Sequence, residues 1–569
     1  MPVNIITTEM FAELREFGGY YVDKTEFLVK FLQDPAQADR YRSPSSVTLI
    51  TRPRRFGKTL FMSMLAEFFD ITRESRDLFA GLKVAENKRL CSDWMNKHPV
   101  ISLSLKDIVE DTFEDALDGI RTIMKKLYSD VELKLDKALL GTAERDTMED
   151  ILSASASQRA LRASLSTLSS ILYMQYGKPV IILLDEYDVP VATAAQRGYY
   201  NEMLLFMRIF LSGALKTNPC LRFAILTGAL RITKESIFTG LNNLNCFDIA
   251  HPMYADVFGF TQCEVDQLLV DAGLEEKREA LREWYDGYHF GNRSDIYCPW
   301  SIMKSLADVQ CIPEATPQAY WVGTSGNELP RDFARRLPAE EDIQGKIAAL
   351  LGGNAIAVKL TPNMNYADVL KNASNFWTLL YLTGYLTLTS NAELYEGEKN
   401  ARDSLLVIPN KEVREVFQEE MEAWFANILP VNRQNALYRA LWAQDIQGLE
   451  EQLSALLVGT SFHDAKESYY HGIMYGILAM RYGDTISNGE SGLGLYDIVV
   501  EDRENERAAV LECKRASSAE QMDASVQEAL GQIECRDYGV RLRAKGCKTI
   551  LHVGIAFCQK SARVGFEKT

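Results

Sequence analysis

Two runs of residues have the types and the order that phosphate binding requires. The first is Thr51-Arg-Pro-Arg-Arg-Phe-Gly57-Lys58-Thr59. A tight turn at a helix N-terminus aims backbone N–H groups at an anion, so Lys58 would reach the β- and γ-phosphates and Thr59 would bind Mg²⁺. Arg52 stands where the pattern G-x-x-x-x-G-K-[ST] has its first glycine. The match is therefore incomplete, and a basic strand-to-helix turn is the simpler alternative.

The second run, Val180-Ile-Ile-Leu-Leu-Asp185-Glu186, is apolar and ends in two acids. A carboxylate at the end of a buried strand is costly unless it meets a cation or a strong donor. We therefore expect Asp185 to hold Mg²⁺ through its water shell and Glu186 to orient or deprotonate the attacking water. Acid pairs also cap ordinary strands, but together with Gly57-Lys58-Thr59 this pair predicts nucleotide binding.

A third apolar run, Phe223 to Leu226, ends in Thr227-Gly228. Its position predicts that Thr227 faces the γ-phosphate, with Arg231 following as a charge sensor. Arg54 and Arg55 would supply charge to phosphates or to a neighbouring subunit, or would pair with surface acids. The sequence favours neither alternative, so a homo-oligomer stays open.

A separate group of residues near the C-terminus has the chemistry of phosphodiester cleavage. Asp497 and Glu512 lie in apolar runs on either side of the charged turn Glu501 to Arg507. A hairpin would bring the two carboxylates together and place Lys514 on the same face as Glu512. Two carboxylates that share Mg²⁺, with a lysine beside the attacking water, can cut a phosphodiester. The pattern is loose, and it gains specificity from a helix before it and a helix carrying Gln532 after it.

The elements that would position the first site alternate between buried strands and helices. Apolar runs typical of parallel strands recur at Val47 to Thr51, Val100 to Leu105, Val180 to Leu184 and Phe223 to Leu226. Amphipathic stretches such as Leu60 to Asp70 and Phe113 to Tyr128 separate them. This alternation predicts an α/β fold with a parallel sheet, helices on both faces and ligands at the carboxyl ends of the strands.

The rest of the chain predicts three further regions. After a first domain at 1–255, Thr261 and Glu264 form a capping box that opens a helical, aromatic-rich lid at 256–330. A mainly helical, winged-helix-like region at 331–458 would carry a small β-wing around the charged turn Asn391 to Arg402. An α/β domain at 459–569 would follow, with its elements in this order: a helix at Ala465 to Arg481, strands at Leu495 to Val500 and Ala508 to Cys513, a helix at Ala519 to Cys535 and a strand at Thr549 to Phe557.

Composition narrows the classes of protein and of partner. A chain of 569 residues with a net charge of −16 is multi-domain and does not coat nucleic acid over its whole surface. The segment Arg541 to Thr569 is basic, however, and is either a nucleic-acid contact or a solvated face. No run reaches the roughly 18 apolar residues of a membrane helix. The ten cysteines form no CxxC pair, so we expect reduced thiols and a cytoplasmic location.

Several segments together resemble one bacterial and archaeal family. Members join an AAA-ATPase-like domain to a C-terminal PD-(D/E)XK nuclease-superfamily domain. The resembling segments are Tyr20-Tyr-Val-Asp-Lys24, Thr51 to Lys58, Leu184-Asp-Glu-Tyr-Asp188, Thr227-Gly-Ala-Leu-Arg231, Ser236 to Asn243, Phe258-Gly-Phe-Thr261, Trp284-Tyr-Asp-Gly-Tyr288 and Glu467-Ser-Tyr-Tyr-His471.

The resemblance implies site residues and cofactors. The family's loop also has an arginine in place of the first glycine, so the Arg52 departure is a family trait. ATP and Mg²⁺ are the implied cofactors, and the nucleotide-binding set is Arg52, Arg55, Phe56, Gly57, Lys58, Thr59, Asp185, Thr227 and Arg231. The implied metal ligands are Thr59, Asp185, Asp497 and Glu512, and the implied catalytic groups are Glu186, Asp497, Glu512, Lys514 and Gln532.

Two points leave the function open. Family members carry a basic residue two positions before the aspartate, where this chain has Leu495, which weakens the expected phosphate contact. The aromatic run from Trp284 to His289 could stack bases, although packing of a lid is the commoner use. We predict an ATPase that gates a metal-dependent nuclease acting on nucleic acid, in defence or DNA maintenance. The alternative is a nucleotide-dependent switch whose C-terminal domain binds without cutting.

Overall fold

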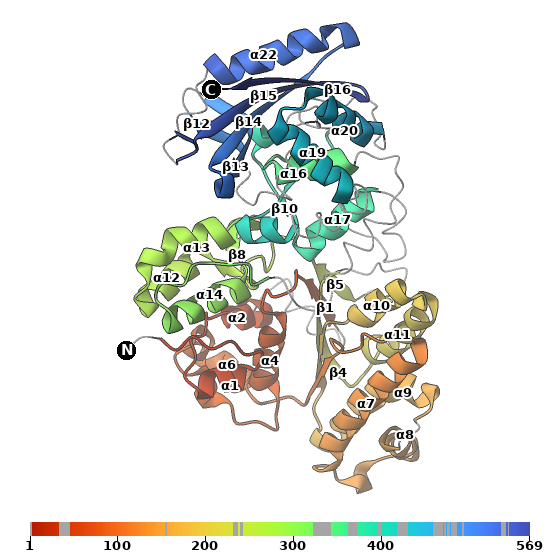
Figure 1. Cartoon of the computed structure of the whole chain (residues 1–569). Coiled ribbons are helices and arrows are strands. Elements are labelled where there is room, and N and C mark those ends of the chain that lie inside the picture. Colours follow the sequence, from red (N-terminus) through yellow and green to blue (C-terminus); the bar gives the residue numbers. More distant parts are fainter. Residues whose placement is uncertain are drawn as a thin grey trace.

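The chain folds as an α/β protein with two separate five-stranded sheets and a mostly helical region between them (Figure 1). The computed structural model describes residues 3–33, 46–153, 156–230, 237–238, 243–321, 343–361, 373–395, 400–417, 431–458, 470, 474, 478, 486–491, 494–535, 542–543 and 546–568. The predicted fold class is confirmed. The domain boundaries remain predictions, because one continuous apolar core reaches from Phe11 to Val564.

The first sheet is parallel and brings three predicted chemical segments to one edge. Its spatial order is β2 (Val100–Ser104), β3 (Val180–Asp185), β4 (Leu221–Gly228), β1 (Ser46–Thr51) and β5 (Leu244–Phe247). Ile50 on β1 pairs with Thr227 on β4, and Leu184 on β3 pairs with Leu226. The carboxyl ends of β1, β3 and β4 therefore meet, which is where ligands bind in such sheets. β5 was not predicted, because its four residues are too short an apolar run and include Asn245.

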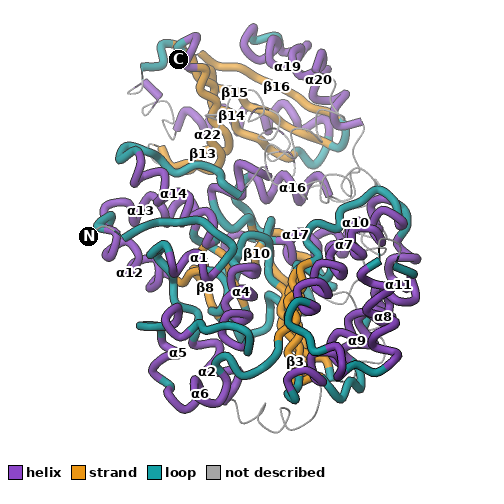
Figure 2. The backbone as a smooth tube through the Cα atoms, turned by 90° about the horizontal axis from the view of Figure 1, so that it is seen from below, coloured by secondary structure: helices purple, strands orange, loops and turns teal. Residues whose placement is uncertain are grey.

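Helices cover both faces of this sheet. α4 contacts β2 and β3, while α9 and α11 contact β3 and β4. Figure 2 shows the strands between these two groups of helices. The helices of this region are α1 (Phe11–Glu16), α2 (Glu26–Gln33), α4 (Lys58–Phe69), α5 (Lys83–Glu86), α6 (Lys88–Trp94), α7 (Phe113–Glu132), α8 (Thr142–Leu152), α9 (Gln158–Tyr176), α10 (Val189–Arg197) and α11 (Tyr200–Leu215).

The lid region contains a small antiparallel sheet as well as helices. Its strands are ordered β6 (Phe260–Thr261), β8 (Arg293–Tyr297) and β7 (Tyr288–Phe290), and its helices are α12 (Gln262–Ala272), α13 (Arg278–Tyr285) and α14 (Pro299–Cys311). The predicted capping box at the start of α12 is present, since Thr261 and Glu264 satisfy each other's backbone N–H groups.

The middle region is helical with a three-stranded wing. It holds α16 (Ile343–Leu351), α17 (Ala373–Thr383), α19 (Val431–Ala443) and α20 (Ile446–Val458). β11 (Ser404–Val407) pairs with β10 (Thr387–Leu388) across the predicted charged turn, and β9 (Ile356–Val358) adds a third strand. The β-wing is therefore confirmed and is one strand larger than predicted.

The second sheet lies at the opposite end of the molecule from the first (Figure 1). Its order is β12 (Ile486–Ser491), β13 (Gly494–Asp502), β14 (Arg507–Arg515), β15 (Thr549–Cys558) and β16 (Ser561–Lys568). β14 and β15 pair in parallel, with α22 (Met522–Cys535) between them in sequence, and the other described pairs of this sheet are antiparallel. The predicted hairpin, the helix and the strand at β15 are confirmed, and β12 and β16 were missed.

The basic C-terminal segment folds into strands and does not form a free tail. β16 alternates buried Ala562 and Val564 with exposed Ser561 and Arg563, and it packs against α20. This alternation is typical of a half-buried strand. Of the predicted helix Ala465 to Arg481, the described positions Tyr470, Met474 and Leu478 are helical and buried. The remainder lies outside the described residues.

Candidate functional site

The phosphate loop runs from β1 into the N-terminus of α4. Gly57 caps the helix with φ of 82°, a left-handed conformation that glycine adopts without strain. No atom would meet a Cβ at this position, so backbone conformation and not space favours glycine here. The turn leaves the first N–H groups of α4 at the sheet edge, where the helix dipole favours an anion.

Lys58 lies inside this loop and is almost fully buried. Its Nζ donates to the carbonyl oxygens of Arg52 at 3.1 Å and Pro53 at 2.9 Å. It also pairs with the Glu186 carboxylate at 3.2 Å. The ammonium is therefore held by the loop itself, beside the strand-end acid that was predicted to act on water.

Asp185 is the centre of a compact hydroxyl network. Thr59 Oγ1 donates to Oδ2 at 2.7 Å, and Thr227 Oγ1 donates to Oδ1. Burial raises the pKa of Asp185, the charge of Glu186 adds to this rise, and the two hydroxyl groups oppose it. Three predicted residues from α4, β3 and β4 thus meet at one carboxylate.

This oxygen-rich group fits the ligand preference of Mg²⁺, which takes carboxylate and hydroxyl oxygens and retains several waters. Thr59 and Asp185 are the two residues that would hold the ion. Bound there, Mg²⁺ would offset negative charge on the β- and γ-phosphates.

Glu186 and the residues after it form a strained turn. Glu186 has φ of 52°, which is uncommon outside glycine and clusters at functional sites. Two positions on, Asp188 accepts from the backbone N–H of Leu230 at 2.8 Å, and Tyr187 donates its hydroxyl to the Leu230 carbonyl at 2.7 Å. Burial raises the pKa of Asp188 to about 6.

Gly228 leaves room for the hydrogen bonds that Asp188 and Tyr187 make with the Leu230 backbone. A Cβ at residue 228 would collide with the side chains of Asp188 and Tyr187. Asp188 and Gly228 lie in segments that carry the family resemblance, but no role was predicted for either residue. Arg231, the predicted charge sensor, lies outside the described residues, so that assignment remains a prediction.

The Arg52 side chain differs from the prediction of a phosphate contact. It is fully buried and donates to the carbonyl oxygens of Thr51, Phe247 and Tyr254 at 2.7, 3.1 and 2.8 Å. Burial lowers the pKa of Arg52 to about 10. The guanidinium therefore ties the start of the loop to the segment from Phe247 to Tyr254.

Arg55 and Phe56 turn toward the lid. The Arg55 guanidinium lies 4.9 Å from the Trp300 ring centroid, and its Nη1 donates to the Tyr320 carbonyl oxygen. Phe56 is buried against Tyr288 and Phe290, with ring centroids 4.9 and 5.0 Å apart. Both side chains therefore anchor the loop to the lid, and their predicted contact with nucleotide remains a prediction.

Two tyrosines of the aromatic run pack inside the protein, which is the commoner use of such residues. Tyr285 and Tyr288 are both fully buried. Tyr288 donates its hydroxyl to the Gly384 carbonyl at 3.0 Å, and a Cβ on Gly384 would press against Pro53 of the phosphate loop. The loop is thus enclosed by the lid on one side and by the end of α17 on the other.

The resembling segment near the N-terminus also holds the lid. Lys24 Nζ lies 2.7 Å from both carboxylate oxygens of Glu264 and donates to the Asp256 carbonyl at 2.9 Å. Tyr20 donates to Asp271 on α12 at 2.7 Å. These contacts give the segment a structural role.

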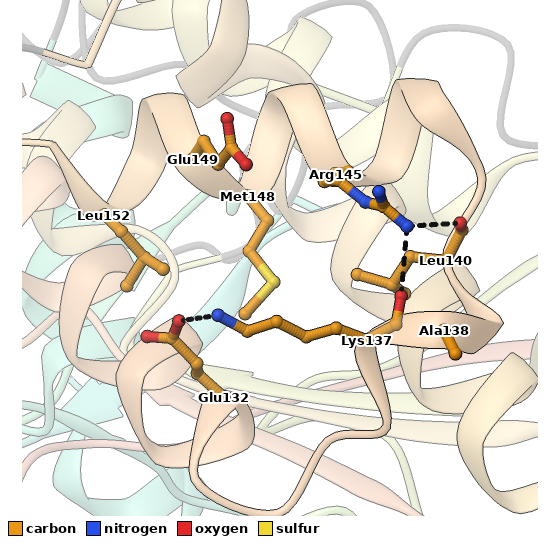
Figure 3. A pocket seen from close by; sticks show the side chains of 8 residues that line it. All are labelled: Glu132, Lys137, Ala138, Leu140, Arg145, Met148, Glu149 and Leu152. Carbon is orange, nitrogen blue, oxygen red and sulfur yellow. Dashed lines mark hydrogen bonds and ion pairs between the residues drawn. The ribbon is translucent and has the colours of Figure 1, made fainter.

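A hollow between the ends of α7 and α8 has no part in this site (Figure 3). Lys137 there pairs with Glu132 at 2.6 Å, and Arg145 donates to the carbonyl oxygens of Lys137 and Leu140. Both of its basic side chains therefore bind groups of the hollow's own lining.

The C-terminal group is built on the hairpin of β13 and β14. Ile498, which follows Asp497, pairs with Leu511, which precedes Glu512. The backbone positions of the two acids are therefore neighbours on adjacent strands, which lie about 5 Å apart in a sheet. The side chain of Asp497 lies outside the described residues.

Glu512 is buried and meets two of its predicted partners. Lys514 Nζ lies 3.5 Å from its Oε1, and Gln532 on α22 donates to the same oxygen. Glu512 pairs in register with Gly554 on β15, where a Cβ would collide with the α22 backbone. This glycine lets α22 approach closely enough for Gln532 to reach the carboxylate.

The described residues hold no cluster of three or more His, Cys, Asp or Glu side chains suited to a metal. Glu512 supplies one carboxylate, and Asp497 would supply the other, which is a ligand set that suits Mg²⁺. Metal binding here remains a prediction.

Two family models match the two parts of the chain that contain these residues. Residues 5–238 match a model described as a predicted AAA-ATPase, and residues 465–567 match the PD-(D/E)XK nuclease superfamily. The chain is therefore similar to an AAA-ATPase-like model in its first part and to the PD-(D/E)XK nuclease superfamily in its last part, as the resemblance predicted.

A relative shows similarity over both segments. A protein of Azotobacter chroococcum mcd 1, named as an uncharacterized protein in the vnfD 5' region, is 28% identical over 99% of this chain and 97% of its own length. Within the described ranges of the present chain, no helix combines the length and apolar character needed to cross a bilayer.

Proposed function

We propose that the first sheet binds and hydrolyses ATP with Mg²⁺. The observation that carries this proposal is the convergence of Thr59, Asp185 and Thr227, with Lys58 beside them. Phosphate oxygens would compete with Glu186 for the Lys58 ammonium. Glu186, once released, would orient or deprotonate water against the γ-phosphate.

The C-terminal domain would cut nucleic acid in a metal-dependent reaction, under control of the ATPase. Asp497 and Glu512 would hold Mg²⁺, Lys514 would stabilise charge near the attacking water, and Gln532 would orient Glu512. DNA is the favoured substrate class, in defence or DNA maintenance in the cytoplasm. A homo-oligomer would give Arg54 a neighbouring site to reach.

A nucleotide-dependent switch is the second candidate. Leu495 favours it, because an aliphatic side chain replaces the basic residue that would contact phosphate. The C-terminal domain would then bind a partner without cutting, and ATP would control that binding.

Lys58→Ala tests the ATPase, because removing the ammonium leaves the phosphate charges uncompensated. We expect Mg-ATP affinity, measured by calorimetry, to fall by about 100-fold or more, the value of one to two strong charged hydrogen bonds. Lys137→Ala is the matched control. Equal ATP affinity in both variants would contradict the P-loop assignment.

Nicking assays separate the two candidates. Single-stranded DNA, double-stranded DNA and RNA would be incubated with Mg²⁺ or Mn²⁺, with and without ATP. If the wild-type protein cuts a substrate and both Asp497→Ala and Glu512→Ala abolish the cutting, the result supports the nuclease. Nucleic-acid binding that depends on ATP, with no cutting of any substrate, supports the switch.

A further inference from the structure

Glu412 is a buried carboxylate that belongs to neither of the sites above. It lies in the helical residues 411–417 of the middle region and has no exposed surface. Ser301 donates to its Oε2 at 2.8 Å, and the backbone N–H groups of Tyr320 and Trp321 donate to its Oε1, each at 2.8 Å. A buried carboxylate is costly, and such donors offset the cost.

The peptide unit between Tyr320 and Trp321 connects this carboxylate to the phosphate loop. Its carbonyl oxygen accepts from Arg55 Nη1, and its N–H donates to Glu412. The positive end of the peptide dipole thus faces the carboxylate and the negative end faces the guanidinium. Hydrogen bonds aligned in this way strengthen one another. Trp300 reinforces the unit, because its Nε1 donates to the same carbonyl at 3.2 Å.

Arg55 needs such support because its backbone is strained. Its φ of 68° lies in the left-handed region, which costs a non-glycine residue roughly 1–2 kcal/mol. The surrounding structure must impose this conformation. Its carbonyl accepts from the Cys298 thiol at 3.6 Å, and its guanidinium rests on Trp300. Only Phe56 separates Arg55 from Gly57, so the turn at Arg55 sets the direction in which Gly57 and Lys58 are presented.

We propose that Glu412 is a positioning residue for the phosphate loop. Through the Tyr320–Trp321 peptide unit it fixes the Arg55 side chain, and thereby the left-handed turn that presents Gly57 and Lys58. This inference rests on the proposed function, since it concerns how the loop grips ATP. It also makes that grip depend on docking of the middle region against the lid.

A second contact beside Glu412 supports this dependence. Asn410 donates to the Tyr285 carbonyl of the lid at 3.1 Å, and a Cβ on Gly287 would collide with the Pro409 backbone. The segment that carries Glu412 is therefore fitted closely to the lid. A displacement of the middle region would remove the carboxylate from the Tyr320–Trp321 unit.

A double-mutant cycle tests the proposal. Glu412→Gln keeps the shape and removes the charge, and Arg55→Met keeps most of the length and removes the guanidinium. We expect each to raise the Kd and KM for Mg-ATP about tenfold, as expected for one lost charged hydrogen bond, with a change in kcat of less than about twofold. The double variant should bind no more weakly than the weaker single variant, because both changes break one chain of contacts.

Controls separate this proposal from a purely structural role and from the ATPase assignment. Glu393→Gln, an exposed position in the same region, should leave ATP affinity unchanged. Unchanged affinity in both single variants, or additive losses in the double variant, would overturn the positioning role. If Glu412→Gln does not fold, Glu412→Asp decides the matter, because it keeps the charge and shortens the side chain; an unchanged KM in that variant would overturn the positioning role. Unchanged affinity in Lys58→Ala would instead refute the P-loop assignment itself.

Discussion

Thr227→Val isolates the contribution of one hydroxyl group to the strand-end network. Valine has nearly the shape of threonine, and Thr227 has no exposed surface, so the change removes the O–H donor to Asp185 and little else. Depriving a buried charged acceptor of one donor costs roughly 1–3 kcal/mol. We therefore expect the region around β3 and β4 to lose about 2 kcal/mol of stability when Asp185 is ionised, which is a factor of about 30 in its opening equilibrium.

The loss should depend on pH in a defined direction. Thr227 opposes the rise in the pKa of Asp185, so it stabilises the ionised carboxylate. The valine variant should therefore lose more stability at a pH where Asp185 is ionised than at an acidic pH, where more of the acid is protonated. Its affinity for Mg-ATP should also fall, because protonation of Asp185 competes with the metal.

Hydrogen exchange of the β3 and β4 amides measures the local opening free energy, and it does not require the whole chain to unfold in one step. Thr122→Val on α7 is the matched control, because its hydroxyl donates to the Asp118 carbonyl at a solvent-exposed position. Equal losses in the two variants, or a loss from Thr227→Val that is the same at both pH values, would refute the assigned role of the network.

Further predictions concern catalysis, packing and pH. Glu186→Gln should keep Mg-ATP bound and reduce turnover by about 100-fold or more, as expected for a general base; normal turnover in single-turnover assays would make it an ordinary strand-end acid. Lys514→Ala should retain divalent-ion binding in calorimetry and slow cleavage by on the order of 100-fold, whereas Glu512→Gln should weaken both. Gly287→Ala should lower the melting temperature, because its φ of 120° and the facing backbone exclude a side chain; an unchanged melting temperature would contradict this close fit. Burial raises the pKa of Glu412 to about 7 from 4.5. The folded state therefore binds the extra proton between these values, and stability should fall as pH rises from about 4.5 to 7. Glu412→Gln should make that fall shallower in thermal unfolding.

The strand-end chemistry was predictable because it depends on long, fully buried strands. β3 is apolar throughout until Asp185, so both the strand and its carboxyl end are visible in the sequence. Parallel pairing then requires Asp185 and Thr227 to be neighbours. The contact between them follows from topology that the alternation of strands and helices already indicates.

The surroundings of Arg52 were not predictable, since its acceptors come from distant parts of the chain. The carbonyls of Phe247 and Tyr254 lie 195 and 202 residues away in sequence. An arginine in place of a loop glycine indicates phosphate contact as readily as burial. Glu412 is similar, because an acid among the charged residues of its segment gives no sign that three donors converge on it.

Edge strands account for the remaining difference between the predicted and the observed secondary structure. β16 alternates apolar and polar residues, but the basic charge of the segment from Arg541 to Thr569 indicated a nucleic-acid contact or a solvated face and no strand after Phe557. β12 contains a glycine and polar residues, and pairing with β13 supplies what its own sequence does not. Both are edge strands, whose formation depends on a neighbour more than on intrinsic propensity.

Control of the C-terminal site by ATP has a physical route in the contacts between regions. The phosphate loop touches the lid and the end of α17, and α20 holds β16 through Glu450, which accepts from the Val564 N–H at 3.0 Å. Contiguity alone does not establish coupling, which requires two arrangements that both sites bias. Linkage supplies a check that does not depend on cutting. If ATP changes the affinity for nucleic acid by some factor, nucleic acid must change the affinity for ATP by the same factor. If the two affinities change by the same factor, and if Lys58→Ala abolishes both changes, the result supports control by ATP in either the nuclease or the switch. A cutting assay then distinguishes these two candidates.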